Sequence, residues 1–210
     1  RDGAIDFSAT AAGHWSFRPL TAPPPLPAPA AAATPIDQFL SEQRTARGLQ
    51  ASVASDRRTL IRRATFDLWG LPPTWEEVQA FVQNEDPAAW PQLVDRLLDS
   101  PLYGQRWGRH WLDVARYADT KGYVFQENHR YPFSYTYRDY VIDALNADKP
   151  YDRFIVEQLA ADRLGLPDGD SALAALGFLT VGPRYLNREP DIIDDRIDLV
   201  TRGLMGLTVA

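Results

Sequence analysis

Cysteine is absent from the 210-residue sequence, which also holds only three histidines and one methionine. Without cysteine, these residues can form neither a disulfide framework nor a thiolate metal site. The histidines are His14, His110 and His129, and they are too scattered to form a zinc-binding pair of the His-x₃-His type. The sequence therefore predicts no metal site within the chain.

Long apolar runs and an excess of basic residues are also missing. No apolar run approaches the roughly 20 residues that a membrane-spanning helix needs, so we expect no membrane span. Acidic residues outnumber basic ones by 28 to 22, and the net charge of −6 argues against nucleic acid as a partner. The sequence opens with Arg1 rather than methionine and stops inside an apolar run, so we expect a piece of a longer protein.

The spacing of apolar residues predicts a mainly α protein, a compact multi-helix orthogonal bundle. Residues 1–34 are expected to form an extended N-terminal segment with a Pro/Ala-rich linker, and residues 35–210 a helical domain that is truncated at its C-terminus. Caps, breakers and apolar periodicity predict helices over 34–47, 56–69, 74–82, 88–98, 100–119, 134–145, 151–163, 171–181 and 191–207.

The expected helix over residues 100–119 is the most informative stretch. Its aromatic and apolar side chains share one face, which we expect to be buried; they are Tyr103, Trp107, Trp111, Val114 and Ala118. One flank carries the small residues Gly104, Gly108 and Ala115, which would allow another helix to approach closely. The other flank carries ionisable side chains.

That ionisable flank supplies the candidate catalytic residues. Arg106, His110, Asp113 and Tyr117 are three or four residues apart, so their side chains can reach one another on a helix. A histidine beside a carboxylate can act in acid–base chemistry or help to bind an anion. The alternative is a histidine hydrogen-bonded at the edge of an aromatic core, with a purely structural role.

Candidate ligand-binding residues follow in the same stretch and in the segment after it. Asp119 with Glu127 could bind a hard cation or sugar hydroxyls, although their spacing does not match a calcium loop and a helix-terminating turn is the alternative. Aromatic side chains nearby could stack on a sugar ring or belong to the core. The ligand-binding candidates are Trp107, Trp111, Asp119, Tyr123, Glu127 and Arg138.

Two long stretches carry a resemblance to a known family. The runs DRRTLIRRATFDLWGLPPTWEEVQAFV and VDRLLDSPLYGQRWGRHWLDVARYADTKGY resemble the DUF1549 family, also called PSCyt2, the planctomycete cytochrome-associated domain. The resemblance implies an exported protein, periplasmic or extracellular, with cytochrome c-like (PSCyt1) and DUF1553 domains as partners in the same polypeptide. It also implies a Cys-x-x-Cys-His haem-attachment segment directly after a run like the one that ends at Ala210.

From the resemblance we expect no cofactor within these residues and a c-type haem in the full-length protein, for which Met205 is a weak ligand candidate. The leading hypothesis is an accessory or scaffold domain that supports haem-linked electron transfer or module docking. The alternative is a carbohydrate-binding or polysaccharide-acting domain at the cell envelope. Whether the chain is an enzyme is left open.

Overall fold

The computed structural model describes residues 13, 14, 18, 19, 21, 34–119, 131–182, 185 and 188–209. Helices dominate these residues, and none of them lies in a β-strand, which confirms the predicted mainly α fold. The backbone contacts group the chain into two units, residues 1–54 and residues 55–210. The predicted division at residues 34 and 35 stays a prediction.

The first unit contains helix α2, Pro35–Ala46. Thr34 begins it with a capping box, because its hydroxyl accepts the Asp37 backbone N–H at 3.2 Å and the Asp37 carboxylate accepts the Thr34 backbone N–H. Within this unit the apolar side chains of Ile36, Phe39 and Leu40 are exposed.

The second unit begins with helices α3 (Arg57–Leu68), α4 (Trp75–Gln83) and α5 (Ala89–Leu98). Asp56 caps α3, and Thr74 with Glu77 forms the predicted capping box of α4. The three helices enclose a small hydrophobic cluster made of Ile61, Ala64, Phe81, Ala89, Leu93 and Leu97.

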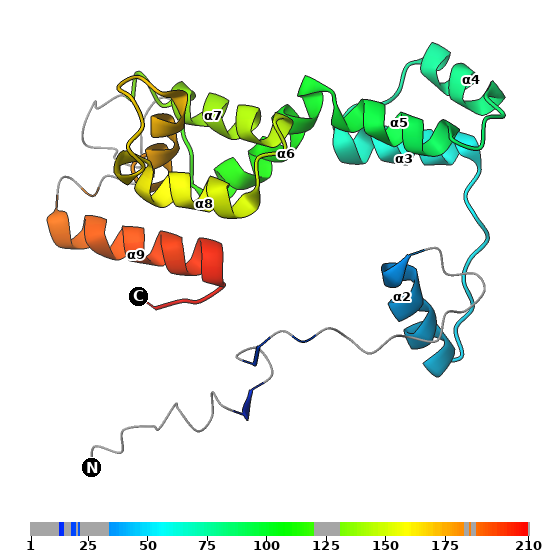
Figure 1. Cartoon of the computed structure of the whole chain (residues 1–210), viewed down its shortest axis with the longest axis horizontal. Helices are drawn as coiled ribbons and strands as arrows, with labels where there is room; N and C mark the ends of the chain where they lie inside the picture. The colour runs from blue at the N-terminus through cyan, green and yellow to red at the C-terminus, as the bar shows by residue number, and fades with distance from the viewer. Residues whose placement is uncertain are drawn as a thin grey trace. The chain divides into compact units, whose positions relative to one another are not determined.

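Helices α6 (Pro101–Val114) and α7 (Tyr135–Asn146) pack closely against each other (Figure 1). Gly104 and Gly108, the predicted small-residue flank, face α7 and are both buried. The Gly104 backbone N–H donates to Oδ1 of Asn146 at 2.7 Å. A Cβ atom on Gly104 would lie 2.5 Å from the carbonyl oxygen of Ile142, so this approach requires glycine.

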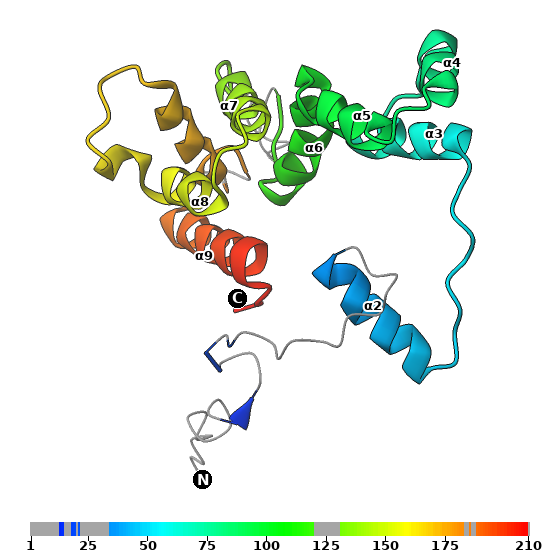
Figure 2. The same ribbon diagram turned by 45° about the vertical axis from the view of Figure 1, so that its right-hand side comes forward.

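The main core lies among α6, α7, α8 (Tyr151–Ala160), the 3₁₀ segments η2 (Ala161–Arg163) and η3 (Ser171–Leu179), and α9 (Glu189–Met205). Figure 2 shows α9 running beside α8. The buried residues of this core are Ala115, Tyr137, Tyr140, Val141, Ala144, Phe154, Ala172, Ala175, Phe178, Val181 and Leu199.

The predicted helix over 100–119 is wrong at its C-terminal end. Helix α6 stops at Val114, and Arg116 adopts a left-handed backbone conformation with φ of 55°. The Arg116 guanidinium forms a two-pronged ion pair with Asp195 of α9, and this long-range contact accompanies the turn. Tyr117 and Ala118 consequently lie beyond the helix.

The expected helix over 171–181 is 3₁₀ rather than α-helical, and the one over 151–163 is α-helical only as far as Ala160. Residues 161–163 continue α8 as η2, and residues 171–179 form η3, which Asp170 caps through the Ala172 backbone N–H at 2.8 Å. In the part of the chain that the structure describes, no helix is long and apolar enough to cross a membrane.

Candidate functional site

A pocket of about 420 Å³ opens between α6, the end of α7 and the start of α8. We call it the aromatic pocket, because aromatic rings form most of its wall. None of its lining residues is acidic. Its lining residues are Tyr103, Trp107, His110, Trp111, Val114, Ala144, Leu145, Lys149, Tyr151 and Phe154.

The aromatic pocket exists because the aromatic face of α6 is only partly covered, contrary to the prediction that this face is buried. Trp107 is 41% exposed, Val114 38% and Tyr151, across the pocket on α8, 63%. The small-residue flank lies against α7 instead, since glycine allows the closest contact between the helix backbones. Exposed aromatic surface in a concavity is typical of a binding site rather than of a folding core.

Trp111 forms the floor of the aromatic pocket, and two hydrogen bonds and ring packing hold it in place. Its indole N–H donates to Oε1 of Gln158 at 2.7 Å and to the Tyr137 hydroxyl oxygen at 3.1 Å. The Tyr137 hydroxyl donates to the same Gln158 oxygen at 2.7 Å, and burial raises the pKa of Tyr137 well above its usual value. The Trp111 ring also packs edge-on against Phe154, with centroids 4.9 Å apart.

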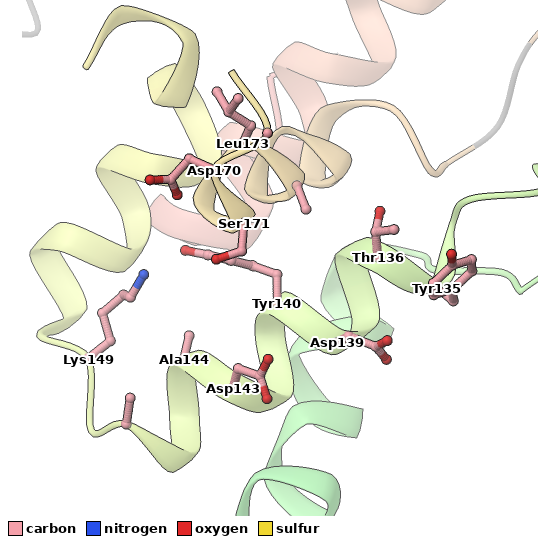
Figure 3. Close-up of a pocket in the computed structure, with 13 residues that line it drawn as sticks. Tyr135, Thr136, Asp139, Tyr140, Asp143, Ala144, Lys149, Asp170, Ser171 and Leu173 are labelled. Carbon is pink, nitrogen blue, oxygen red and sulfur yellow. The ribbon is translucent and has the colours of Figure 1, made fainter. Parts of the chain in front are cut away.

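A second, larger concavity of about 700 Å³ lies between α7 and the start of η3 (Figure 3). We call it the polar cleft. Asp139 and Asp143 project from α7 one turn apart, while Asp170 and Ser171 lie across the cleft at the start of η3. The remaining lining residues are Tyr135, Thr136, Tyr140, Ala144, Ala147, Lys149, Gly169, Leu173 and Ala174.

Lys149 and Ala144 line both concavities, so the aromatic pocket and the polar cleft adjoin each other. The Lys149 ammonium donates to the carboxylate of Glu157 and lies 4.9 Å from the centre of the Tyr140 ring. Figure 3 shows its amine directed into the space beside Tyr140.

Glu157 is the buried charge behind this shared wall, with 3% of its surface exposed. Its carboxylate accepts hydrogen bonds from Lys149, from Nε of Arg153 at 2.7 Å and from the Tyr140 hydroxyl at 2.9 Å. Burial opposes its negative charge, but these three donors together outweigh burial and hold the pKa of Glu157 below its usual value. The same burial, with the hydrogen bond to Glu157, raises the pKa of Tyr140.

The carboxylates of the polar cleft differ in whether they already have a hydrogen-bond or ion-pair partner. Asp139 pairs with Arg138 at 3.0 Å, and one oxygen of Asp170 caps η3. Among the described residues no side chain donates to the Asp143 carboxylate, and none bonds to the Ser171 hydroxyl. These two groups are therefore free to accept from, or donate to, a polar ligand.

The candidate catalytic residues do not form a hydrogen-bonded group in the described structure. His110 and Asp113 are exposed, and no described contact joins them; the His110 ring packs on Trp107 with centroids 5.5 Å apart. Arg106 packs over Gly70, and its buried Nε has no partner among the described residues. Tyr117 lies past the end of α6, and its hydroxyl donates to Asp119 at 2.5 Å. Their catalytic role stays a prediction.

The structure brings three of the predicted residues together outside the aromatic pocket, near the start of α7. Arg138 pairs with the Asp119 carboxylate at 3.2 Å, and the Tyr117 hydroxyl donates to the same oxygen. Burial, and then the hydrogen bond to Asp119, raise the pKa of Tyr117. Trp107 and Trp111 lie in the aromatic pocket, whereas Tyr123 and Glu127 fall outside the described residues.

Neither a metal site nor a haem ligand is evident among the residues that the structure describes. No cluster of three or more histidine, cysteine, aspartate or glutamate side chains could hold a metal there. Met205, the weak haem-ligand candidate, is 61% exposed at the end of α9. Its role as a ligand stays a prediction.

Sequence reasoning missed the residues that join the two concavities. Neither Lys149, which precedes Pro150, nor Glu157 is among the candidate residues that the sequence predicts. The signal that could have found the pair is Glu157 itself, because Phe154, three residues before it, and Ala161, four residues after it, are both buried. A carboxylate on an inward face requires a cationic partner.

Comparison with known proteins identifies the family. No curated protein and no solved structure matches the chain. A family model does match, over residues 35–210, and it is described as PSCyt2, protein of unknown function (DUF1549). This match covers most of the sequence and includes every residue of the aromatic pocket and the polar cleft. The chain therefore belongs to the PSCyt2 (DUF1549) family.

Proposed function

We propose that this domain is an accessory scaffold of an exported, cytochrome c-associated protein, and that it docks a neighbouring module through the aromatic pocket. The PSCyt2 designation supports an association with cytochromes. In this proposal the partners are cytochrome c-like (PSCyt1) and DUF1553 domains of the same polypeptide. The assembly would act in haem-linked electron transfer in the periplasm or outside the cell.

The observation that carries the proposal is the exposed aromatic rim above a rigid floor. Trp107 and Tyr151 present large apolar surfaces to solvent, while Trp111 between them is fixed by two hydrogen bonds. Tryptophan and tyrosine in a preformed pocket are the residues that most often dominate the binding energy of protein interfaces. Binding a partner here costs little conformational entropy on the side of this domain, because the pocket walls are helices that already pack on the core.

Haem, in this proposal, is carried by another part of the polypeptide. Covalent attachment of a c-type haem requires two cysteine thiols, and this chain has no cysteine. The residues present therefore do not fit a resident c-type haem. The contribution of this domain is to hold a haem-bearing module in place, and no step of electron transfer is assigned to its side chains.

A calorimetric titration of the full 210-residue chain with separately produced PSCyt1 and DUF1553 domains tests the docking proposal. We expect at least one module to bind, and Trp107→Ala and Tyr151→Ala each to weaken binding about tenfold or more. Trp75→Ala is the matched control, since Trp75 is 65% exposed on α4 and lies outside the pocket. Failure of both modules to bind, or equal weakening by the control, would contradict the proposal.

Carbohydrate binding is the second candidate function, and the polar cleft is the observation that favours it. The cleft combines the Asp143 carboxylate and the Ser171 hydroxyl, which have no described partners, with the exposed ring of Tyr135. Carboxylates and hydroxyls can bond sugar hydroxyls, and a ring can cover an apolar sugar face. The predicted sugar site around Asp119, Tyr123 and Glu127 stays a prediction, since Tyr123 and Glu127 fall outside the described residues.

Thermal melting with neutral oligosaccharides, such as xylo-, cello- and laminari-oligosaccharides, tests the second candidate. A ligand that binds the folded chain raises the melting temperature by mass action. We expect Asp143→Asn and Ser171→Ala to reduce the shift, and Asp162→Asn, an exposed carboxylate outside the cleft, to leave it unchanged. No shift with any of these sugars would remove this candidate.

A further inference from the structure

We infer that the aromatic pocket takes an anionic anchor: a bulky apolar side chain, aromatic or branched, with a carboxylate beside it in the partner sequence. The inference rests on the proposed docking function, because it names the chemistry of the docked segment. It follows from the polar groups that remain at the pocket once their internal partners are counted.

The apolar part of the anchor is set by the shape and composition of the pocket. Its volume of about 420 Å³ is enough for one large side chain and the neighbouring backbone. Trp107 and Tyr151 form the exposed rims on α6 and α8, and Phe154 is 6% exposed at the base. A ring inserted among these residues can make edge-to-face contacts with several of them.

The polar part of the anchor is set by the absence of acids and the presence of donors. None of the ten lining residues is acidic, whereas Lys149 brings an ammonium group with three donor hydrogens. Only one acceptor for that ammonium, Glu157, is found among the described residues. The hydroxyls of Tyr103 and Tyr151 also have no described partner, so both can donate to an incoming acceptor.

The ion-pair group next to the aromatic pocket also carries a net positive charge, which favours an anionic ligand. Glu157 carries one negative charge but is bonded by two partly exposed cations, Lys149 and Arg153, so this group of three has one excess positive charge. Carboxylates nearby work against an anion at longer range: Asp113 on α6, Asp152 on α8, and Asp139 and Asp143 in the adjoining polar cleft. Salt screens these exposed and partly exposed charges, so the preference for an anion is expected to be modest and largest at low salt.

Three acetylated and amidated tripeptides test the inference: Asp-Phe-Asp, Ser-Phe-Ser and Lys-Phe-Lys. Binding to the full chain is followed by the indole N–H signals of the six tryptophans in ¹H–¹⁵N NMR spectra. We expect the Trp107 and Trp111 signals to shift, and those of Trp75 and Trp90, which are outside the pocket, to stay in place. At low salt the acidic peptide should bind about threefold to tenfold more tightly than the basic one.

Variants at Lys149 separate charge from packing. Lys149→Met should abolish the preference for the acidic over the basic peptide. Lys149→Arg keeps the positive charge and should retain that preference, which shows that the loss in Lys149→Met is not due to unfolding. Equal or tighter binding of Lys-Phe-Lys by the unaltered chain would overturn the anionic anchor and leave module docking intact. Shifts confined to Trp75 or Trp90, or none with any peptide, would overturn both the anchor and the use of this pocket for docking.

Discussion

Replacing Gly104 by alanine tests whether the contact between α6 and α7 holds the second unit together. The new Cβ atom would lie 2.5 Å from the Ile142 carbonyl oxygen and 2.5 Å from Oδ1 of Asn146. The Asn146 side chain can rotate away, but the Ile142 oxygen belongs to the backbone of α7. The two helices must therefore separate, and the hydrogen bond from the Gly104 N–H to Asn146 is weakened.

The magnitude follows from three contributions. Overpacking of a tight contact costs about 1–3 kcal/mol, and loss of the Asn146 hydrogen bond costs about 1 kcal/mol. Alanine regains about 1 kcal/mol over glycine through its higher helix propensity. We therefore expect Gly104→Ala to lower the free energy of unfolding by about 2 kcal/mol.

Gly108→Ala is the matched control in the same helix. Its Cβ would lie 3.3 Å from Cγ1 of Ile142, a side-chain atom that can move by a few tenths of an ångström. The gain in helix propensity should offset this smaller contact, so the change in stability should stay within about 1 kcal/mol.

Urea unfolding, followed by circular dichroism and by tryptophan fluorescence, measures both variants. With a denaturant slope of about 2 kcal/mol per molar, Gly104→Ala should lower the urea midpoint by about 1 M and Gly108→Ala by less than half of that. Equal midpoints for the two variants would refute the reasoning that backbone contact at Gly104 sets the distance between α6 and α7.

Two further substitutions, and the pH dependence of one of them, concern the polar groups of the core. Glu157→Gln should remove about 2–3 kcal/mol of stability, because it leaves two cations without their carboxylate; the partial exposure of those cations keeps the loss below that of a fully buried pair. Since folding lowers the pKa of Glu157 below its ordinary value of 4.5, its stabilising contribution is complete above that value and is lost as the pH falls from there through the lowered pKa. The variant should therefore lose less stability than the unaltered chain as the pH falls below 4.5. Gln158→Leu should cost about 2 kcal/mol, because the Tyr137 hydroxyl loses its acceptor and the Trp111 indole keeps only one.

Urea midpoints at several pH values check all three expectations. Asp162→Asn is the control for Glu157, because Asp162 pairs with Arg163 at the surface and should contribute less than about 0.5 kcal/mol. A Glu157→Gln variant as stable as this control would show that the buried carboxylate is not needed. An unchanged stability of Gln158→Leu would contradict the role assigned to the Trp111 hydrogen bonds.

Most helix starts could be predicted from the sequence, because the interactions that begin a helix are local. Thr34 and Thr74 cap their helices together with an acidic residue three positions on, and Ser100 caps α6 just before Pro101. The end of α6 could not be predicted in this way. The turn at Arg116 is accompanied by an ion pair with Asp195, which is 79 residues away in the sequence.

The candidate site was predictable only in part, for a related reason. Helical spacing placed Trp107 and Trp111 on one face, and the structure agrees. Spacing also predicted that another helix approaches the glycine flank, but it could not reveal that the aromatic face is left only partly covered, since this depends on which helices pack around it. The polar cleft combines Asp143 with Ser171, and only the tertiary fold brings these distant positions together.

The wall shared by the two concavities has a thermodynamic consequence. Lys149 and Ala144 face the aromatic pocket on one side and the polar cleft on the other, so a ligand that shifts Lys149 changes both cavities at once. Linkage then requires reciprocity: if occupancy of the cleft changes the affinity of the pocket by some factor, occupancy of the pocket changes the affinity of the cleft by the same factor. With such a coupling, the affinities of two ligands measured separately on this domain would differ from those that each shows in the presence of the other.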